Sequence, residues 1–411
     1  MTGRPRGIRA GGRHRLPVLA AVAVLGLAIV SAITLSQATD HRTTTPPRSG
    51  ATSSASTAGP GNSHSASAIP AASQPWLSPV GRQVVGHLRP GSKPSVLPSS
   101  LLIVDKFNNR LIVVDPQGRI RWQFPQAGDL APGQTFRIPD DAFFTPDARY
   151  LIATQEDQAV ITLIDIAKHR IVYRYGVPGH PGMTANHLSN PDDAIVLPDG
   201  YILSADIKNC RLVLIAPRAH TPAHIIGRTT TACLHDPPRR WGSPNGIFPM
   251  PNGHYLVTEI NGDWVDSIGL DGTIYWTTHP PGVSYPSDSN QIGPDRFLTV
   301  DYANPGRVVI FDHTGHQIWS YRGTGSNTLN HPSLALPLPN GDIVLNDDYN
   351  HRVIVINPHT NTIVWQYGTT GVAGSRPGYL NNPDGLDLVP PQSLLITHST
   401  TMGLWPTAPT K

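Results

Sequence analysis

Residues 331–368 read HPSLALPLPNGDIVLNDDYNHRVIVINPHTNTIVWQYG, and this stretch defines the unit from which the chain is built. It begins with a proline and an apolar segment and continues with DIVLND (342–347), HRVIVINP (351–358) and TIVWQYG (362–368). These segments are short, rich in β-branched and aromatic residues, and bounded by Gly, Pro, Asn or Asp. The unit therefore predicts four short strands joined by turns.

This unit recurs, and each copy begins with a proline that precedes a small polar residue and an apolar strand. Successive prolines lie 42 to 53 residues apart, a period typical of repeat architectures. The six motifs are RIPDDAFF with Pro139, SNPDDAIV with Pro191, GSPNGIFP with Pro244, SYPSDSNQ with Pro286, NHPSLALP with Pro332 and NNPDGLDL with Pro383.

The two ends of the repeat region complete each other. Residues 101–124 carry three strand patterns without an inner strand before them, and residues 385–389 supply the missing strand. Pairing of these segments hides sheet edges that would otherwise be free to associate. The sequence therefore predicts an all-β fold, a six-bladed β-propeller closed by the C-terminal strand. Residues 393–398 look like one further strand, so an additional outer strand or a seventh blade is the alternative.

The last strand of most units carries aromatic residues at two positions. Alternate residues of a strand point to the same face, so these side chains are predicted to pack against the next sheet rather than to bind a ligand. The first position holds Trp122, Tyr173, Trp276, Trp319 and Trp365, and the second holds Phe124, Tyr175, Tyr321 and Tyr367.

The N-terminal part of the chain differs in composition from the rest. Every Phe, Trp and Tyr lies at or after Trp76. Residues 1–75 have a net charge of +6, which leaves −3 for the remainder of a chain whose total is +3, so a nucleic-acid-binding domain is disfavoured. Residues 38–75 are rich in Ser, Thr, Ala and Pro and cannot bury enough apolar surface to offset their ordering entropy. We expect them to form a disordered stalk before a propeller domain at 76–411.

An uncharged segment precedes this stalk. The nineteen residues 17–35 span about 28 Å as a helix, close to the thickness of a bilayer's hydrocarbon core, and five arginines precede them. This pattern predicts a basic cytoplasmic tail at 1–16, a transmembrane signal-anchor at 17–37 and an extracytoplasmic remainder, hence a single-pass protein of the cell membrane. A signal peptide cleaved near Ala38 is the alternative.

Cys210 and Cys233 are the only cysteines of the chain. Outside the cytoplasm such a pair predicts a disulfide bond rather than a redox or metal site, and the chain has no CxxC motif.

The prolines also locate a candidate site. In a four-stranded blade, the loop leading to the inner strand and the loop between the second and third strands open on the same face. The residues after the prolines are therefore expected to surround the mouth of the central channel: Asp140, Asp192, Asn245, Ser287, Ser333 and Asp384, with Asp141, Asp193 and Asp288 directly behind. Converging carboxylates repel one another unless a cation lies among them, and oxygen ligands favour Ca²⁺ or Mg²⁺. We predict a metal site made by Asp192, Asn245 and Asp384.

Several of these segments resemble known propeller families. LLIVDKFNNRLIVVDPQGRI (101–120) is similar to an NHL repeat, and HTGHQIWSYRG (313–323) looks like a strand of PQQ-type propellers. SPNGI (243–247) and NPDGL (382–386) resemble metal-binding loops of the SMP-30-like, TolB-like six-bladed propellers. That resemblance implies that Asn245 is a metal ligand and that Asp384 is a ligand and catalytic base. The family's ligand Glu in the first blade has no counterpart here.

Two further groups of charged residues have more than one interpretation. The pairs Asp105/Arg110, Asp206/Arg211 and Asp347/Arg352 recur in several units, so we expect them to hold hairpins rather than to act in catalysis. The loop CLHDPPRRWGS (233–243) contains residues suited to anion binding or acid–base catalysis, unless it is simply solvated: His235, Asp236, Arg239 and Arg240.

Together these features predict a membrane-anchored, extracytoplasmic propeller that binds a small molecule or a cell-envelope protein through its acidic mouth without catalysis. The alternative is a divalent-metal-dependent hydrolase, lactonase or lyase of the SMP-30 or NHL type, and a PQQ-type redox protein is a third interpretation. The chain has no P-loop and no dinucleotide-binding glycine motif, so no nucleotide cofactor is expected. The acidic mouth also disfavours nucleic acid as a partner.

Overall fold

The computed structural model describes residues 74–78 and 86–399. The chain divides into two units, 1–67 and 68–411, and all described residues belong to the second. The predicted tail at 1–16, the predicted anchor at 17–37 and nearly all of the predicted stalk at 38–75 lie outside the described residues. Among the described residues, no helix combines the length and apolar character required to cross a bilayer.

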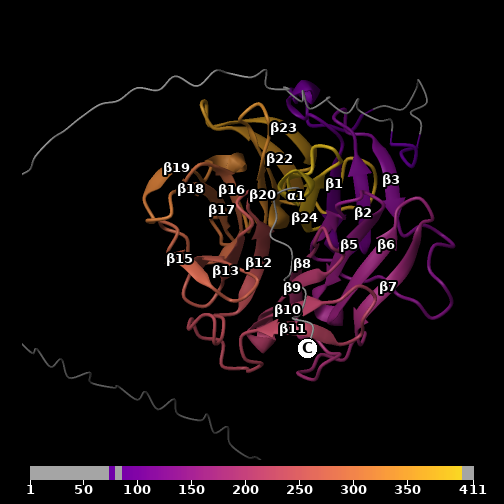
Figure 1. Ribbon diagram of the computed structural model, residues 1–411. Helices are drawn as coiled ribbons and strands as arrows, with labels where there is room; N and C mark the ends of the chain where they lie inside the picture. Colours follow the sequence, from indigo (N-terminus) through magenta and orange to yellow (C-terminus); the bar gives the residue numbers. More distant parts are fainter. Residues whose placement is uncertain (1–73, 79–85, 400–411) are drawn as a thin grey trace, which may run out of the picture. The chain divides into compact units, whose positions relative to one another are not determined.

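Six four-stranded antiparallel sheets form a ring, and the inner strands of neighbouring sheets contact one another (Figure 1). The first three sheets, each given from its inner to its outer strand, are β24 (Pro383–Leu388), β1 (Leu101–Asp105), β2 (Arg110–Val114) and β3 (Ile120–Phe124); β4 (Ala142–Phe144), β5 (Tyr150–Gln155), β6 (Val160–Asp165) and β7 (Arg170–Gly176); and β8 (Pro191–Val196), β9 (Ile202–Asp206), β10 (Arg211–Ile215) and β11 (Pro222–Ile226).

The remaining three sheets follow the same order. They are β12 (Pro244–Pro249), β13 (Tyr255–Glu259), β14 (Trp264–Ile268) and β15 (Ile274–Thr278); β16 (Pro286–Gly293), β17 (Arg296–Asp301), β18 (Arg307–Phe311) and β19 (Gln317–Tyr321); and β20 (Ala335–Pro337), β21 (Ile343–Asp347), β22 (Arg352–Asn357) and β23 (Thr362–Gly368). The short helices are η1 (Pro94–Val96), η2 (Lys106–Asn108), η3 (Glu156–Gln158), η4 (Ile207–Asn209), η5 (Gly325–Asn327), η6 (Asp348–Asn350) and α1 (Leu394–Ser399). The prediction of an all-β propeller with six blades is confirmed.

The ring closes where the C-terminal strand β24 pairs with β1. Leu101 lies opposite Leu388, and Ile103 lies opposite Leu386. All five residues of β1 and all six of β24 are buried, which is expected when both faces of an inner pair are covered by neighbouring blades. Closure by a strand from the far end of the chain is therefore as predicted.

The predicted aromatic positions link adjacent blades. Trp122 Nε1 of the first blade donates to the Ile166 carbonyl of the second at 3.2 Å. Trp365 Nε1 of the sixth blade donates to the Pro116 carbonyl of the first at 2.9 Å. Because each indole buries its rings and satisfies its N–H on the next sheet, these residues belong to the packing of the ring.

The interpretation of residues 393–398 as a strand is wrong. The segment belongs to helix α1, which contacts the inner strands β4 and β12, so it covers an end of the channel. The Ile396 N–H donates to Ser393 Oγ at 3.4 Å, the hydrogen bond of a helix N-cap. Leu395 is buried, and this burial rather than strand pairing decides the local structure. The described residues form six blades and no seventh.

The repeated acid–arginine pairs hold hairpins, as expected. Arg110, Arg211 and Arg352 each donate from Nε to the aspartate five residues earlier, at 2.7 Å in all three cases. The other oxygen of each aspartate accepts a backbone N–H at 2.7 Å from the loop that leads to the inner strand of the same blade; the donors are Asn381, Ser189 and Asn330. These bonds position the loops that form the mouth of the channel.

Candidate functional site

The mouth of the channel is a polar hollow of about 120 Å³ to which all six blades contribute. All six residues that follow the repeated prolines line it, where the sequence placed them. The lining residues are Asp140, Asp192, Asn245, Ser287, Ser333 and Asp384 from the inner strands and the loops leading to them, together with Lys106, Glu156, Tyr285 and Tyr302. Their roles in binding remain predictions.

The sequence interpretation missed Lys106, Glu156, Tyr285 and Tyr302, and of these Lys106 forms ion pairs with the predicted carboxylates. Its Nζ forms ion pairs with Asp140 and with Asp384, the latter at 2.6 Å, and lies 3.8 Å from Glu156 Oε2. The lysine side chain is 13% exposed, so the pair is shielded from water. A cation among the converging carboxylates was expected, and the structure supplies it from the protein itself.

The position of Lys106 in the repeat could have indicated that it lies near the mouth. This lysine is the first residue after β1, directly behind the hairpin acid Asp105, and Glu156 and Tyr302 occupy the corresponding places after β5 and β17. The hairpins open on the same face as the proline loops, and this position lines the mouth in three of the blades. Lysine, glutamate and tyrosine share no pattern there, which is why the position does not stand out in the repeat.

The two carboxyl groups on Lys106 differ in protonation. Burial alone would raise the pKa of Asp384, but the Lys106 ammonium and the hydrogen bonds from Asp140, Lys106 and Ser333 together hold that pKa below its ordinary value. Burial raises the pKa of Asp140 well above its ordinary value despite the same lysine, with Asp384 adding to the rise. Asp384 is therefore the ionised partner, and its charge is already balanced by an ammonium group.

The predicted metal ligands divide into two places. Asn245 Nδ2 donates to Asp192 Oδ2 at 2.7 Å, so these two side chains are neighbours. Asp384 is instead bound by Lys106. Among the described residues, the channel carboxylates whose oxygens approach within 4.8 Å of one another form two groups, Asp140 with Asp141 and Asp192, and Asp141 with Asp193 and Asp288.

The inner carboxyl groups Asp141, Asp193 and Asp288 are buried. Asp193 Oδ2 accepts the Ile247 N–H at 2.7 Å and thereby joins two blades. Burial raises the pKa of Asp193 to about 7. Burial, together with the charge of Asp193, raises the pKa of Asp141 and of Asp288 well above the ordinary value. Asp141 and Asp288 therefore hold protons at neutral pH unless a cation replaces them, whereas Asp193 titrates near neutral pH.

The loop at 233–243 does not contribute to the mouth. Arg239 is exposed and is not among the lining residues. His235 lies 2.9 Å from Glu259 Oε1 through Nδ1, so its acidic partner is this buried glutamate of β13 rather than the adjacent Asp236. Periodicity could not reveal that contact, because the two residues belong to different loops and strands.

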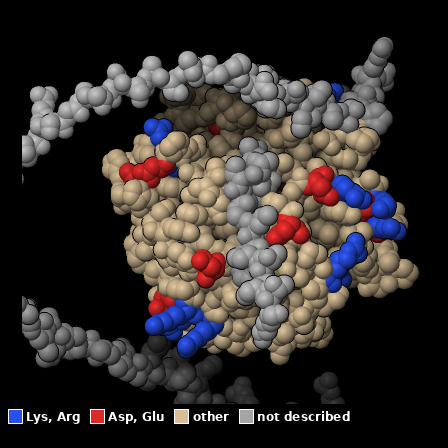
Figure 2. Space-filling model, in the orientation of Figure 1, with Lys and Arg blue, Asp and Glu red and all other residues tan. Residues whose placement is uncertain are grey.

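The protein surface shows no concentration of positive charge on the face in Figure 2. Lysine and arginine side chains lie there in small groups near acidic ones, and most of the described surface in that view is uncharged. Non-specific nucleic-acid binding relies on a basic stripe or patch, and none is visible on the described part of this face.

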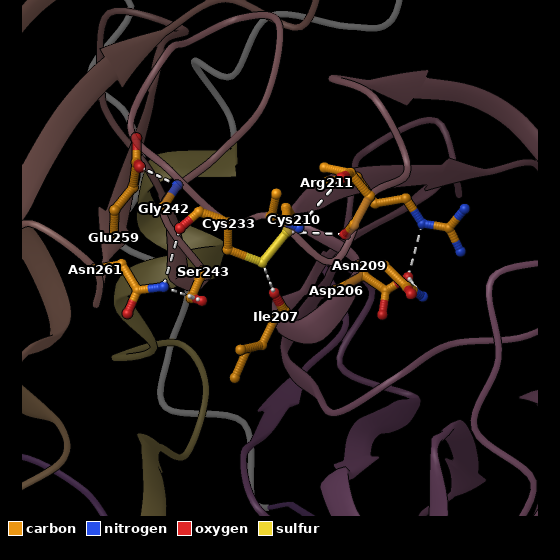
Figure 3. The surroundings of a disulfide bond; sticks show 12 residues. Asp206, Ile207, Asn209, Cys210, Arg211, Cys233, Gly242, Ser243, Glu259 and Asn261 are labelled. Atoms are coloured by element: carbon orange, nitrogen blue, oxygen red, sulfur yellow. Dashed lines mark hydrogen bonds and ion pairs between the residues drawn. A yellow bond between two sulfur atoms is a disulfide. The ribbon is translucent and has the colours of Figure 1, made fainter.

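The predicted disulfide is confirmed. Cys210 and Cys233 are bonded, with their Cα atoms 5.0 Å apart (Figure 3). The bond attaches the start of the 233–243 loop to the hairpin of the third blade, and Asn261 Nδ2 donates to the Cys233 carbonyl at 3.1 Å.

Replacing both cysteines with alanine is expected to lower the free energy of unfolding by about 3 kcal/mol, because the unfolded chain regains the freedom of a closed loop. Denaturant unfolding measures this change. Adding a reductant should destabilise the wild-type protein similarly and leave the double variant unaffected. Equal stability of the oxidised wild type and the double variant would contradict the prediction.

Comparison with known proteins supports a propeller of the PQQ type over part of the chain. The family model described as outer membrane protein assembly factor BamB matches residues 235–378, about a third of the sequence. The narrower resemblance to NHL and SMP-30 proteins has no matching family model among these findings and stays a prediction. No curated protein matches the chain.

Solved structures with similar folds share little sequence. A Bacteroides caccae protein of unknown function is 15% identical, with 71% of this chain and 99% of that chain covered and a TM-score of 0.49. A chain of the nidogen/laminin complex is 13% identical, with coverages of 72% and 99% and a TM-score of 0.49. Streptogramin B lyase is 20% identical, with coverages of 56% and 68% and a TM-score of 0.41.

Proposed function

We propose that this protein is a non-catalytic binding module that receives a basic side chain of a protein partner at the mouth of its channel. The observation that carries the proposal is the site of Lys106, whose ammonium group is bound between Asp140 and Asp384. The mouth thus binds an alkylammonium group of its own. Glu156 lies 3.8 Å from the same ammonium group, and Asp192 is a further carboxyl group that lines the hollow.

Asp192 is the group best suited to a second cation. Its carboxyl group lines the hollow and is hydrogen-bonded by the neutral Asn245 rather than by a lysine or arginine. Burial and the neighbouring aspartates raise its pKa well above the ordinary value, so an arriving cation displaces a proton from it. Tyr285 and Tyr302 line the same hollow, and aromatic rings are known to attract cations.

The partner that we propose is a protein of the cell envelope. The match of residues 235–378 to a family described as an assembly factor supports a protein rather than a metabolite. As part of the same proposal, residues 17–37 anchor the chain in the membrane and the propeller lies outside the cytoplasm.

The test is binding of short fluorescent peptides to the full-length protein, with a central Lys or Arg compared with norleucine and Glu. We expect only the basic peptides to bind. Asp192→Asn should weaken their binding about tenfold, a loss of about 1.4 kcal/mol. Asp157→Asn is the matched control, because Asp157 is exposed beside Glu156 and does not line the hollow.

Equal binding of acidic and basic peptides, or unchanged affinity in Asp192→Asn, would refute the proposal. Binding of free amines such as lysine methyl ester with the same affinity as the peptides would assign the mouth to a small cationic ligand instead.

A metal-dependent hydrolase or lyase is the second candidate, and the inner carboxylates favour it. The oxygens of Asp141, Asp193 and Asp288 lie within 4.8 Å of one another, and such a set suits Ca²⁺ or Mg²⁺. The ion pair of Asp384 with Lys106 counts against Asp384 as its ligand and general base. Thermal melting with and without Ca²⁺ distinguishes the two candidates, since only the second requires the ion.

A further inference from the structure

A second cluster of ligand-type side chains lies in the fourth blade, away from the residues that line the mouth. It consists of His235 from the loop before β12, Glu259 from the end of β13 and Asp266 from β14. One ligand atom of each residue lies within 4.8 Å of the other two. Antiparallel pairing explains the two acids, because Asp266 lies opposite Val257 and therefore on the same face of the sheet as Glu259.

The buried side chain of Asp266 is the main evidence for a cation site. Its side chain is fully buried, and neither carboxylate oxygen accepts a hydrogen bond of ordinary geometry. The polar side chains beside it are Thr277, which lies opposite it on β15, and Glu259. A buried carboxylate without a well-placed donor is costly, and either a proton or a bound cation compensates its charge.

The other two residues are prepared for the same role. Glu259 is fully buried, its Oε2 accepts the Gly242 N–H, and its Oε1 lies 2.9 Å from His235 Nδ1. The ring of His235 stacks on Trp264 with centroids 4.2 Å apart, and this contact fixes the orientation of the imidazole.

The disulfide and its surroundings hold the histidine in place. His235 follows Cys233 by two residues, and Figure 3 shows the Cys210–Cys233 bond in the same region as Glu259, Gly242 and Asn261. The side chain of His235 is 20% exposed while that of Glu259 is 0% exposed. The site is therefore reached from solvent on the histidine side and closed by protein on the carboxylate side.

We propose that His235, Glu259 and Asp266 form a binding site for a divalent transition-metal ion such as Zn²⁺. One imidazole nitrogen with two carboxylate oxygens is a ligand set for such ions, whereas Ca²⁺ and Mg²⁺ favour oxygen ligands alone. The ion takes the place of the proton between His235 Nδ1 and Glu259 Oε1 and neutralises Asp266. The open histidine side leaves a coordination position for water. This site is independent of the function proposed for the channel mouth.

The test is titration of the metal-free, full-length protein with Zn²⁺, followed by elemental analysis and thermal melting. We expect about one Zn²⁺ per chain and a higher melting temperature with the ion, and Ca²⁺ should not substitute. Asp266→Asn and His235→Asn should each weaken Zn²⁺ binding at least about tenfold. Asp236→Asn is the matched control, because this neighbouring acid lies outside the cluster.

The metal-free variants keep the test informative. Asp266→Asn removes a buried acid and should fold at least as stably as the metal-free wild type, while losing the increase in melting temperature that Zn²⁺ produces. If Zn²⁺ does not raise the melting temperature of the wild type, the proposal is overturned. A response that persists unchanged in both Asp266→Asn and His235→Asn would overturn it as well, since it would place the bound ion elsewhere.

Discussion

Removal of residues 382–411 is expected to abolish the cooperative unfolding transition of the propeller. The deletion takes away β24, whose Leu386 and Leu388 are buried and pair with β1. Loss of one buried leucine side chain costs about 2–5 kcal/mol, so the loss of this strand is comparable to a typical total stability of about 5–15 kcal/mol. It also exposes the edge of β1, a fully buried strand that is then free to pair with other chains.

Circular dichroism melting and size-exclusion chromatography measure the outcome. A chain ending at residue 399 is the matched control, because it retains β24 and α1 and should melt like the full-length protein. A chain lacking 382–411 that is equally soluble and equally stable would show that closure by β24 does not hold the ring together.

Substitution of Lys106 with methionine is expected to lower the free energy of unfolding by about 3–5 kcal/mol at pH 8. The substitution keeps most of the side-chain volume but removes the ammonium group from between Asp140 and Asp384. Breaking a buried ion pair on one side leaves an uncompensated charge, and that is the origin of the large cost. Chemical denaturation at several pH values measures it.

The pH dependence of the stability lost in Lys106→Met shows whether the loss comes from the missing charge or from altered packing. Burial opposes the charged form of Lys106, but the neighbouring carboxylates raise its pKa in the folded protein well above the ordinary 10.5. The stabilisation that Lys106 provides is therefore fully present below pH 10.5, and it is lost only as the pH rises through the higher pKa of the folded state. Between pH 5 and pH 8 it is constant in the wild type. Without the ammonium, burial raises the pKa of Asp384 in the folded variant, and a protonated Asp384 carries no uncompensated charge. The deficit of Lys106→Met should therefore shrink as the pH falls from 8 to 5.

Lys168→Met is the matched control for this prediction. Lys168 pairs with Asp165 at 2.8 Å, but its side chain is 54% exposed. A surface pair of this kind contributes about 0–1 kcal/mol. If Lys106→Met costs no more than Lys168→Met, or if its deficit is independent of pH, the buried ion pair does not have the role assigned to it.

The architecture of this protein follows from local sequence features. The spacing of prolines such as Pro139 and Pro191 determines how many blades exist, because each proline motif begins an inner strand. The hairpin pairs such as Asp206 and Arg211 are also local, since five residues of chain bring them together. For the same reason, the residue that follows each proline could be assigned to the channel mouth from its place in the repeat.

What the sequence by itself determined is thus the six-bladed ring, the partner of its C-terminal strand, the disulfide and the acidic lining of the mouth. Only the tertiary structure decided which cation balances that lining: Lys106 meets Asp384 across 278 residues, and no periodic pattern encodes such a contact. The partnership of His235 with Glu259 and the helical form of residues 394–399 were decided in the same way. The physical reason is that repeated local interactions specify each blade, whereas single side chains at the ends of blades find their partners only after the ring has closed.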